Sequence, residues 1–327
     1  MAGGSLLEIK NLRTSFRISG GVVQAVRGVG LSVGEGEFWG IVGESGCGKS
    51  VTMLSVMGLL PENAAIRADV MAFGGKDLLR ASPREMRSVR GNEIGMIFQD
   101  PMTSLDPLYT IGNQLMEPLR IHGKMSAREA ERRAVEMLEL VGISSPASRL
   151  KQYPHEFSGG MRQRVMIAIA MSCNPKLLIA DEPTTALDVT IQAQILELMK
   201  DMKEKSGTAM VLITHDLGVI ASVCSRIVVM YGGLIMEEGE CEDIFYRPLH
   251  PYTKGLLASI SGMESGTKKK LVPIPGSPPD LMNPPAGCPF TARCAWAMRI
   301  CAAAAPRSAN AGGHSAACWL LHGRRAA

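Results

Sequence analysis

The sequence lacks any long uninterrupted apolar run. Hydrophobic residues make up 46% of its 327 residues, yet no run reaches the roughly 18–20 residues that a membrane-spanning helix needs. The amino-terminal stretch MAGGSLLEIKNLRTSF also lacks the basic start and apolar core that mark a secretory signal. We therefore expect a cytosolic protein that reaches a membrane only through a partner.

Most of the chain also lacks an excess of charge of one sign. Residues 1–255 hold 27 Lys and Arg against 29 Asp and Glu, so they show no strong electrostatic footprint for nucleic acid. Residues 256–327 hold 8 Lys and Arg against 2 Asp and Glu. This basic tail can contact an acidic partner or lipid headgroups, or can serve solubility alone.

The order of predicted elements indicates an α/β fold. Residues 6–43 read as short strands with turns, and further strands are predicted at 177–181, 209–213 and 226–230. Helices are predicted over residues 49–60, 111–142, 159–170 and 190–205. Strands that alternate with helices favour a mostly parallel sheet covered on both faces.

A shift in composition divides the chain. Around residues 264–287 the sequence turns to Lys268–Lys270 and then to the Pro-rich run LVPIPGSPPDLMNPPAG, which cannot form a regular helix. This run reads as a linker. We accordingly expect a main domain over residues 1–255 and a carboxyl-terminal extension over 256–327.

The stretch GESGCGKS at residues 43–50 has the spacing G-x-x-x-x-G-K-S of a phosphate-binding loop. It follows an apolar strand and precedes a helix, which is the context that the motif requires. Glycines let the backbone N–H groups face a phosphate, Lys49 can reach the β- and γ-phosphates of a nucleotide, and the Ser50 hydroxyl can bind Mg²⁺. The residues expected to bind the nucleotide are Gly43, Ser45, Gly46, Cys47, Gly48, Lys49, Ser50 and Val51.

Two adjacent carboxylates end the predicted strand in LLIADEPTTALD, residues 177–188. The carboxyl edge of a parallel sheet is where ligands bind in open α/β folds. Asp181 is therefore expected to help hold Mg²⁺, and Glu182 to act as general base for the attacking water. Without the phosphate-binding loop upstream, the same pair would read as an ordinary helix cap.

The stretch FSGGMRQRV at residues 157–165 resembles the L-S-G-G-Q signature of ATP-binding-cassette (ABC) ATPases. The resemblance implies that Ser158, Gly159 and Gly160, at a helix start, contact the γ-phosphate held by another subunit. It implies the ABC fold, with an antiparallel β part and a helical subdomain beside the main sheet. Met161 departs from the family's Gln, and we expect a modest effect. Trp39, before the loop strand, is unusually bulky.

Further residues match family landmarks in the family's order. The resemblance implies that Phe16 stacks on the adenine ring and that Gln99 senses Mg²⁺ and faces the membrane subunit. It implies that His215 is a switch residue that contacts the γ-phosphate. It also assigns Asp188 to a loop that crosses the dimer interface.

Several longer stretches resemble the oligopeptide/dipeptide branch of ABC importers, which includes nickel transporters. They are QDPMTSLDPLYTIGNQLMEPL, ADEPTTALDVTIQAQILELM, RPLHPYTKGLLASI and PIPGSPPDLMNPPAGCPFTARC. The branch implies an ATPase subunit that powers peptide import from the cytoplasmic face of the cell membrane. Its implied partners are a second, related ATPase chain, two membrane permeases and, indirectly, a solute-binding protein. Nickel or another small solute is the alternative cargo.

Four cysteines fall within 31 residues of the tail: Cys288, Cys294, Cys301 and Cys318. In a cytosolic chain such a cluster favours a metal site over disulfides. The gaps are wider than structural zinc usually prefers, so a [4Fe–4S] cluster is the first expectation. Some members of the resembled branch carry such a cluster here. Zinc, or four unligated thiols, are the alternatives.

Two other function classes stay open on sequence alone. A soluble ABC ATPase that acts on nucleic acid or ribosomes usually has two cassettes or a long coiled-coil insertion, and this chain has neither. A metal-containing regulatory protein could use nucleotide only as a signal. We expect no nucleic-acid partner.

Overall fold

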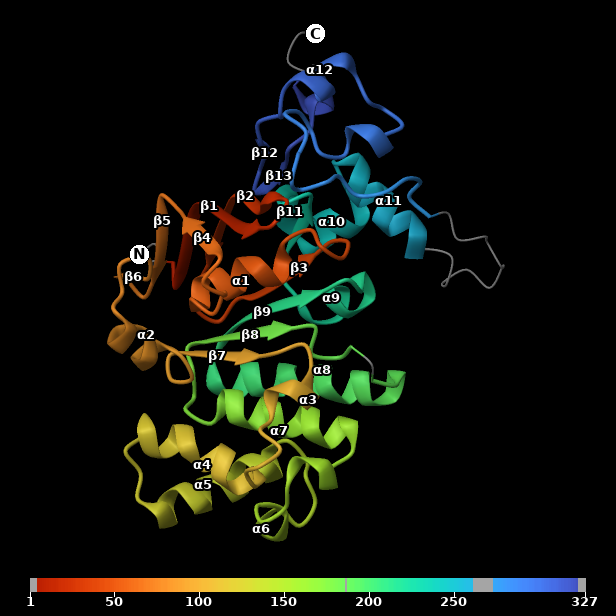
Figure 1. The fold of residues 1–327 in the computed structure, drawn as a ribbon. Helices are drawn as coiled ribbons and strands as arrows, with labels where there is room; N and C mark the ends of the chain where they lie inside the picture. The colour runs from red at the N-terminus through yellow and green to blue at the C-terminus, as the bar shows by residue number, and fades with distance from the viewer. Residues whose placement is uncertain (1–4, 186, 261–272, 323–327) are drawn as a thin grey trace. The chain divides into compact units, whose positions relative to one another are not determined.

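The structure is a computed structural model that describes residues 5–185, 187–260 and 273–322, in two compact units. Of these residues, unit 1 comprises 34–37, 81–185 and 187–212, and unit 2 comprises 5–33, 38–80, 213–260 and 273–322. Lys268–Lys270 of the basic tail lie outside the described residues. Figure 1 gives the labels used below.

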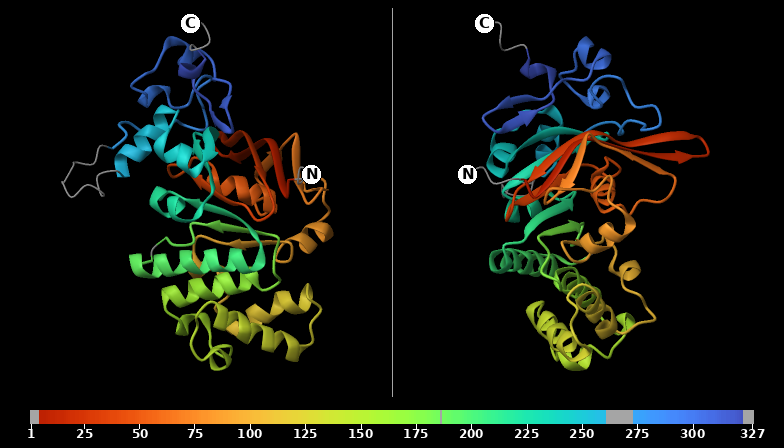
Figure 2. Two further views of the ribbon diagram at one scale, coloured as in Figure 1. Left: turned by 180° about the vertical axis from the view of Figure 1, so that it is seen from behind. Right: turned by 90° about the vertical axis from the view of Figure 1, so that its left-hand side faces the viewer.

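Unit 1 contains a parallel strand pair and a group of helices. Its strands β7 (Ile94–Ile97) and β8 (Leu177–Asp181) are parallel neighbours. The helices are α2 (Pro83–Val89), α3 (Pro101–Ser104), α4 (Ile111–Ile121), α5 (Ala127–Leu140), α6 (Pro146–Arg149), the 3₁₀ turn η1 (Pro154–Glu156), α7 (Gly159–Met171) and α8 (Val189–Ser206). Helix α7 packs on β7 and on α3, α4 and α5 (Figures 1 and 2).

The helical part of unit 1 confirms the expected helix over 111–142 but breaks it in two. Ser126 begins α5 with a capping box, in which its hydroxyl accepts from Glu129 N–H and the Glu129 carboxylate accepts from Ser126 N–H. The buried face of α5 consists of Ala130, Ala134, Met137 and Leu138, at the spacing of a helix with one apolar stripe.

Unit 2 holds two sheets. In the first, β1 (Leu7–Ile18) pairs antiparallel with β2 (Gly21–Val33), β4 (Ala64–Arg67) and β5 (Val70–Phe73), and β5 pairs with β6 (Lys76–Asp77). In the second, β3 (Phe38–Val42) is parallel to β10 (Arg226–Tyr231), and β11 (Leu234–Glu240) continues antiparallel. Strand β9 (Ala209–Thr214) contains the division between the units. The long β1–β2 pair is clear in Figure 2.

The carboxyl-terminal part of unit 2 is more ordered than the expected irregular segment. A hairpin of β12 (Ala309–Ala311) and β13 (His314–Ala316) pairs with β11. The helices and 3₁₀ turns of unit 2 are α1 (Lys49–Met57), α9 (Leu217–Val223), α10 (Cys241–Tyr246), α11 (Pro251–Ile260), η2 (Thr291–Arg293), α12 (Arg299–Ala303) and η3 (Trp319–Leu321). Helix α1 ends at Met57 and not at Leu60, because Gly58 adopts the left-handed conformation of a helix cap.

The bulky Trp39 has a structural reason. It is buried in β3, and its register partner Arg226 on β10 places the guanidinium carbon 4.7 Å from the indole centroid. This is cation–π distance. The buried indole therefore also serves as a platform for a basic side chain.

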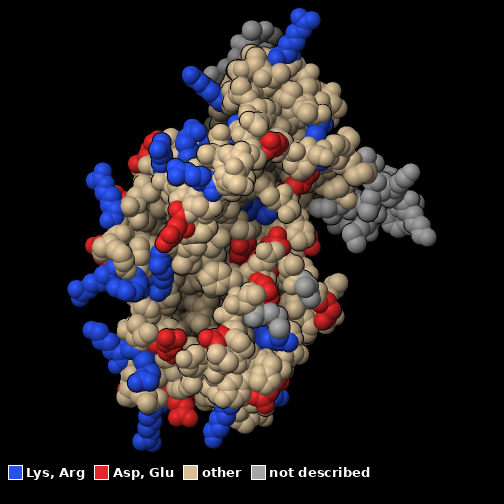
Figure 3. Space-filling view, in the orientation of Figure 1, with Lys and Arg blue, Asp and Glu red and all other residues tan. Residues whose placement is uncertain are grey.

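The described residues include no helix that is both long and apolar enough to cross a bilayer. On the face drawn in Figure 3, basic and acidic side chains are interspersed.

Candidate nucleotide site

The phosphate-binding loop of unit 2 joins a buried strand to a helix. All five residues of β3 are buried, the loop runs from Gly43 to Gly48, and α1 begins at Lys49. The predicted strand–loop–helix arrangement is therefore present. The first turn of α1 thus lies at the loop, where its N–H groups favour an anion.

Two loop positions accept only glycine. A Cβ on Gly43 would lie 2.1 Å from the Met230 carbonyl oxygen, and one on Gly48 would lie 2.5 Å from the Ala25 carbonyl oxygen. Gly48 also has a φ of 101°, a conformation that side chains disfavour. The close approach of β2 and β10 thus fixes where the loop can bend.

The ammonium group of Lys49 lies inside the loop. Its side chain is 6% exposed, and Nζ donates to the Gly43 carbonyl at 2.7 Å and to the Glu44 carbonyl at 3.1 Å. Burial raises the pKa of the neighbouring Cys47 thiol, although Lys49 acts in the opposite direction. Ser45 and Gly46 are exposed, while Ser50 and Val51 are half-buried.

In unit 1 the structure brings Gln99 and Glu182 together. Gln99 Nε2 donates to Glu182 Oε2 at 3.0 Å, and Thr185 Oγ1 donates to the same oxygen at 2.8 Å. Glu182 has a φ of 48°, an uncommon left-handed conformation for a residue other than glycine. Asp181, 5% exposed, ends β8 one residue earlier. The carboxylate of Glu182 is thus oriented by two donors.

The signature residues lie at the start of α7, a helix of 13 residues. The Ser158 hydroxyl accepts from the N–H of Met161 at 3.3 Å. Ser158 and Gly159 are exposed, and Gly160 faces Ile191 of α8. The helix start is therefore open, as an anion site requires.

The remaining predicted residues take different places. The carboxylate of Asp188 accepts from Ile191 N–H at 3.0 Å and so caps α8. Phe16 is half-buried on β1, opposite Ala64 of β4. His215 is exposed directly after β9.

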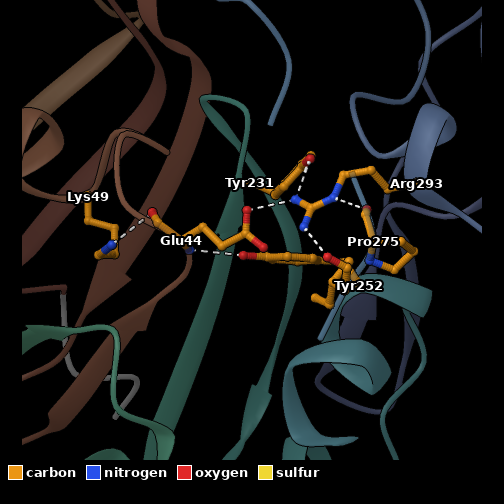
Figure 4. Close-up of polar contacts among 7 residues, drawn as sticks. Glu44, Lys49, Tyr231, Tyr252, Pro275 and Arg293 are labelled. Atoms are coloured by element: carbon orange, nitrogen blue, oxygen red, sulfur yellow. Dashed lines mark hydrogen bonds and ion pairs between the residues drawn. The ribbon is translucent and has the colours of Figure 1, made fainter. Parts of the chain in front are cut away.

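Sequence reasoning missed a set of residues that hold the loop from the carboxyl-terminal part of unit 2. Arg293 Nη1 donates to Glu44 Oε2 at 2.7 Å, and Glu44 N–H donates to the Tyr252 hydroxyl at 2.9 Å (Figure 4). Burial lowers the pKa of Arg293, but bonds to Glu44 and Tyr231 outweigh burial and raise it overall. Arg293 lies 249 residues from Glu44 in the sequence and Tyr252 lies 208 residues from it, so no local motif indicates these contacts.

The four cysteines of the extension line one cavity, with His250 and Phe290 among its other walls. Burial raises the pKa of Cys288 to about 11, and the three neighbouring thiols act in the same direction. No group of three or more His, Cys, Asp or Glu within residues 5–185, 187–260 and 273–322 is arranged to hold a metal ion. The described residues therefore give no support to the expected [4Fe–4S] cluster or to the zinc alternative.

Two family profiles match segments of the chain. A profile of the ABC transporter family matches residues 26–185, and a profile of the oligopeptide/dipeptide transporter carboxyl-terminal region matches residues 236–301. The chain is 55% identical to the dipeptide transport ATP-binding protein DppD of Bacillus subtilis, over 96% of this chain and 94% of that protein. It is 56% identical to the oligopeptide transport ATP-binding protein OppD of the same organism, over 97% of this chain and 89% of that protein.

Solved structures support the same assignment. A dimeric post-hydrolysis structure of the ATP-binding cassette MJ0796, bound to ADP and Pi, matches with a TM-score of 0.64 at 29% identity, over 72% of this chain and 98% of that one. With the loop, the Gln99–Glu182 pair and the open α7 start in place, the chain belongs to the ABC transporter ATPases, and within them to the family of peptide-transport ATP-binding subunits.

Proposed function

We propose that this protein hydrolyses ATP to power the import of oligopeptides or dipeptides across the cytoplasmic membrane. The observation that carries the proposal is the near full-length similarity of the chain to peptide-transport ATP-binding subunits. The chain also has an intact phosphate-binding loop and a Glu182 carboxylate held by Gln99. The cargo follows from those relatives, since no cargo contact is expected in this subunit. Residues 1–255 form the ATPase domain in this proposal, and 256–327 form its extension.

The loop residues hold the nucleotide in this proposal. Loop N–H groups and Lys49 bind the phosphates, and Phe16 stacks on adenine. The Ser50 hydroxyl, the Gln99 amide and the Asp181 carboxylate are oxygen donors of the kind that Mg²⁺ prefers, and bound Mg²⁺ would neutralise phosphate charge. Glu182 accepts the proton of the attacking water, and His215 contacts the γ-phosphate.

A second ATPase chain completes each site. Ser158 and Gly159 are exposed and Gly160 is half-buried at the start of α7, where a phosphate held by a companion can be received. Asp188 lies near the same interface. We propose that the companion is a related but different chain, as in the branch that the sequence resembles. The dimeric arrangement of the similar cassette MJ0796 supports a two-chain assembly.

Membrane permeases are the second class of partner. Unit 1 carries a groove of about 1170 Å³ whose walls include Tyr109 and Ile121 of the α4 region. Tyr109 is 54% exposed and Ile121 is 63% exposed. We propose that one of the two permeases of the transporter docks here and holds the protein at the cytoplasmic face, while the solute-binding protein acts on the far side.

A [4Fe–4S] cluster held by Cys288, Cys294, Cys301 and Cys318 is also part of the proposal. The four cysteines line one cavity, and a [4Fe–4S] cluster takes four thiolate ligands. Iron would supply the positive charge that keeps Cys288 deprotonated despite its raised pKa. Iron analysis and the absorbance spectrum of anaerobically purified protein test this part, and iron-free folded protein would contradict it.

Reconstitution tests the main proposal. The chain, its companion ATPase and two permeases are placed in vesicles with the solute-binding protein and labelled peptide. We expect peptide-stimulated ATP hydrolysis and uptake, both abolished by Lys49→Ala. Uptake of nickel alone would favour the other cargo. Stimulation by DNA or RNA, without any by peptide, would instead favour a nucleic-acid ATPase.

A further inference from the structure

The extension reaches the phosphate-binding loop through one buried guanidinium. Arg293 lies directly before Cys294, its side chain is 5% exposed, and its Nη1 lies 2.7 Å from Glu44 Oε2. Glu44 follows Gly43 and is the one acidic residue in GESGCGKS. A residue of the four-cysteine segment (residues 288–318) therefore holds the side chain of a loop residue (Figure 4).

The guanidinium is itself fixed on all sides. Nη1 also donates to the Tyr231 hydroxyl at 3.0 Å, Nε donates to the Pro275 carbonyl at 2.8 Å, and Nη2 donates to the Ile274 carbonyl at 3.1 Å. Its central carbon lies 5.6 Å from the Tyr231 ring centroid. A planar group with so many partners cannot turn freely, so it offers Glu44 a rigid anchor.

A second contact fixes the loop backbone at the same residue. The Glu44 N–H donates to the hydroxyl of Tyr252, which is fully buried on α11. The rings of Tyr231 and Tyr252 lie 4.5 Å apart, and Phe290 of the four-cysteine segment packs on both. Both the side chain and the backbone of Glu44 are therefore set by the carboxyl-terminal part of unit 2.

We propose that Arg293 is a positioning residue for the phosphate-binding loop. By holding Glu44 it keeps residues 43–48 in the conformation that receives the nucleotide phosphates, so nucleotide affinity depends on the folded four-cysteine segment. A loop that is already ordered loses less conformational entropy on binding. The inference rests on the proposed function for the assignment of this loop to ATP.

Steady-state kinetics in the complete transporter test the inference. We expect Arg293→Ala to raise the KM for ATP about tenfold, a coupling of the size usual between linked sites, with a change in kcat of less than about twofold. Arg293→Lys keeps the charge but not the planar fork, so its KM falls between those of wild type and Arg293→Ala. Arg299→Ala, in an exposed residue of the same segment, serves as the control and keeps the wild-type KM.

A double mutant separates the contact from general damage. Because Arg293 and Glu44 act through one contact, Arg293→Ala with Glu44→Gln should raise the KM no more than the larger single effect. Additive effects would overturn the proposal, as would an Arg293→Ala protein with the KM of Arg299→Ala. If Arg293→Ala does not assemble, Glu44→Gln alone must raise the KM, and an unchanged value overturns the proposal.

Lys49→Ala in the same assay tests the proposed function separately. If it retains full turnover, the nucleotide site itself is misassigned. If it abolishes ATP binding while Arg293→Ala behaves as wild type, the nucleotide site stands and only the positioning role fails.

Discussion

Gln99 Nε2 lies 3.0 Å from Glu182 Oε2, although the two residues are 83 positions apart. Together with Thr185 Oγ1 on the same oxygen, this donor limits the rotation of the Glu182 carboxylate. A general base must be held within hydrogen-bond reach of the water that it activates. These contacts hold the Glu182 carboxylate in place, as the general-base role proposed for it requires.

Replacing Glu182 by Gln should separate hydrolysis from binding. The amide cannot accept a proton, so we expect turnover to fall by about 100-fold or more while ATP still binds. Phosphate release and equilibrium nucleotide binding measure the two effects. Glu204→Gln, in an exposed residue of α8, should leave both unchanged. Undiminished turnover in Glu182→Gln would remove Glu182 from the mechanism.

The open start of α7 allows a test of the two-chain site. A methyl group on Gly159 meets no atom of this chain within 4 Å, so Gly159→Ala should fold with an unchanged melting temperature. If a phosphate of the companion is bound there, turnover of the assembled pair should fall by about tenfold or more. Full activity of the variant in the pair would show that this helix start does not receive a phosphate.

The loop glycines should differ in their tolerance of a side chain. Gly43→Ala places Cβ against the Met230 carbonyl, and we expect it to destabilise the fold by about 1–3 kcal/mol and to abolish ATP binding. Gly46→Ala meets no atom within 4 Å, but its φ of 76° is disfavoured, so the expected loss is smaller. Chemical denaturation and nucleotide titration give the comparison. Equal stability of the two variants would contradict the predicted close approach of β10.

Two variants of Asp188 separate its role as a helix cap from the role of its charge: Asp188→Ala removes both, and Asp188→Asn removes only the charge. As the N-cap of α8, it should contribute about 1 kcal/mol, which Asp188→Ala loses and Asp188→Asn retains. If the carboxylate also acts at the proposed dimer interface, turnover falls in both variants. Thermal unfolding and turnover of the assembled pair are the measurements, and a fully active Asp188→Asn would leave only the helix cap.

Acid should weaken the fold through His250. Burial lowers the pKa of its imidazole to about 4 from an ordinary value of 6.5. Between these values the unfolded chain binds a proton that the folded chain does not, so stability falls as the pH drops from 6.5 to about 4. The full loss is about 3 kcal/mol.

Denaturation at several pH values measures this loss. His250→Asn keeps an acceptor for the Tyr252 N–H and should flatten the pH dependence. His155→Asn, in an exposed residue, should not change it. A slope that persists in His250→Asn would assign the acid sensitivity to another group.

The parts of the fold that sequence predicted are those set by local pattern. The buried strand 177–181 and the helix from Gly159 are present within a residue or two, because each is marked by an apolar run or spacing and a cap. The break between α4 and α5 was missed although Ser126 and Glu129 spell a capping box. Gly58 likewise could have indicated the end of α1.

The parts that sequence did not predict depend on distant pairs. Arg293 and Glu44 meet across 249 residues, and hydrophobic periodicity carries no information about such a contact. The β12–β13 hairpin follows the same rule, since its short strands of three residues each become recognisable only when β11 supplies a partner. Long-range pairing, and not local propensity, determines the structure of these segments.

The indole of Trp39 gives the protein a built-in optical reporter. Of three tryptophans in the chain, Trp39 is 3% exposed beneath the Arg226 guanidinium, whereas Trp296 is 56% exposed and Trp319 half-buried. Its emission should lie to the blue of the other two and resist aqueous quenchers. Trp39 is on β3, which leads directly into residues 43–48. Changes in Trp39 fluorescence should therefore report changes around this strand, and changes in Trp296 fluorescence should report changes in the extension.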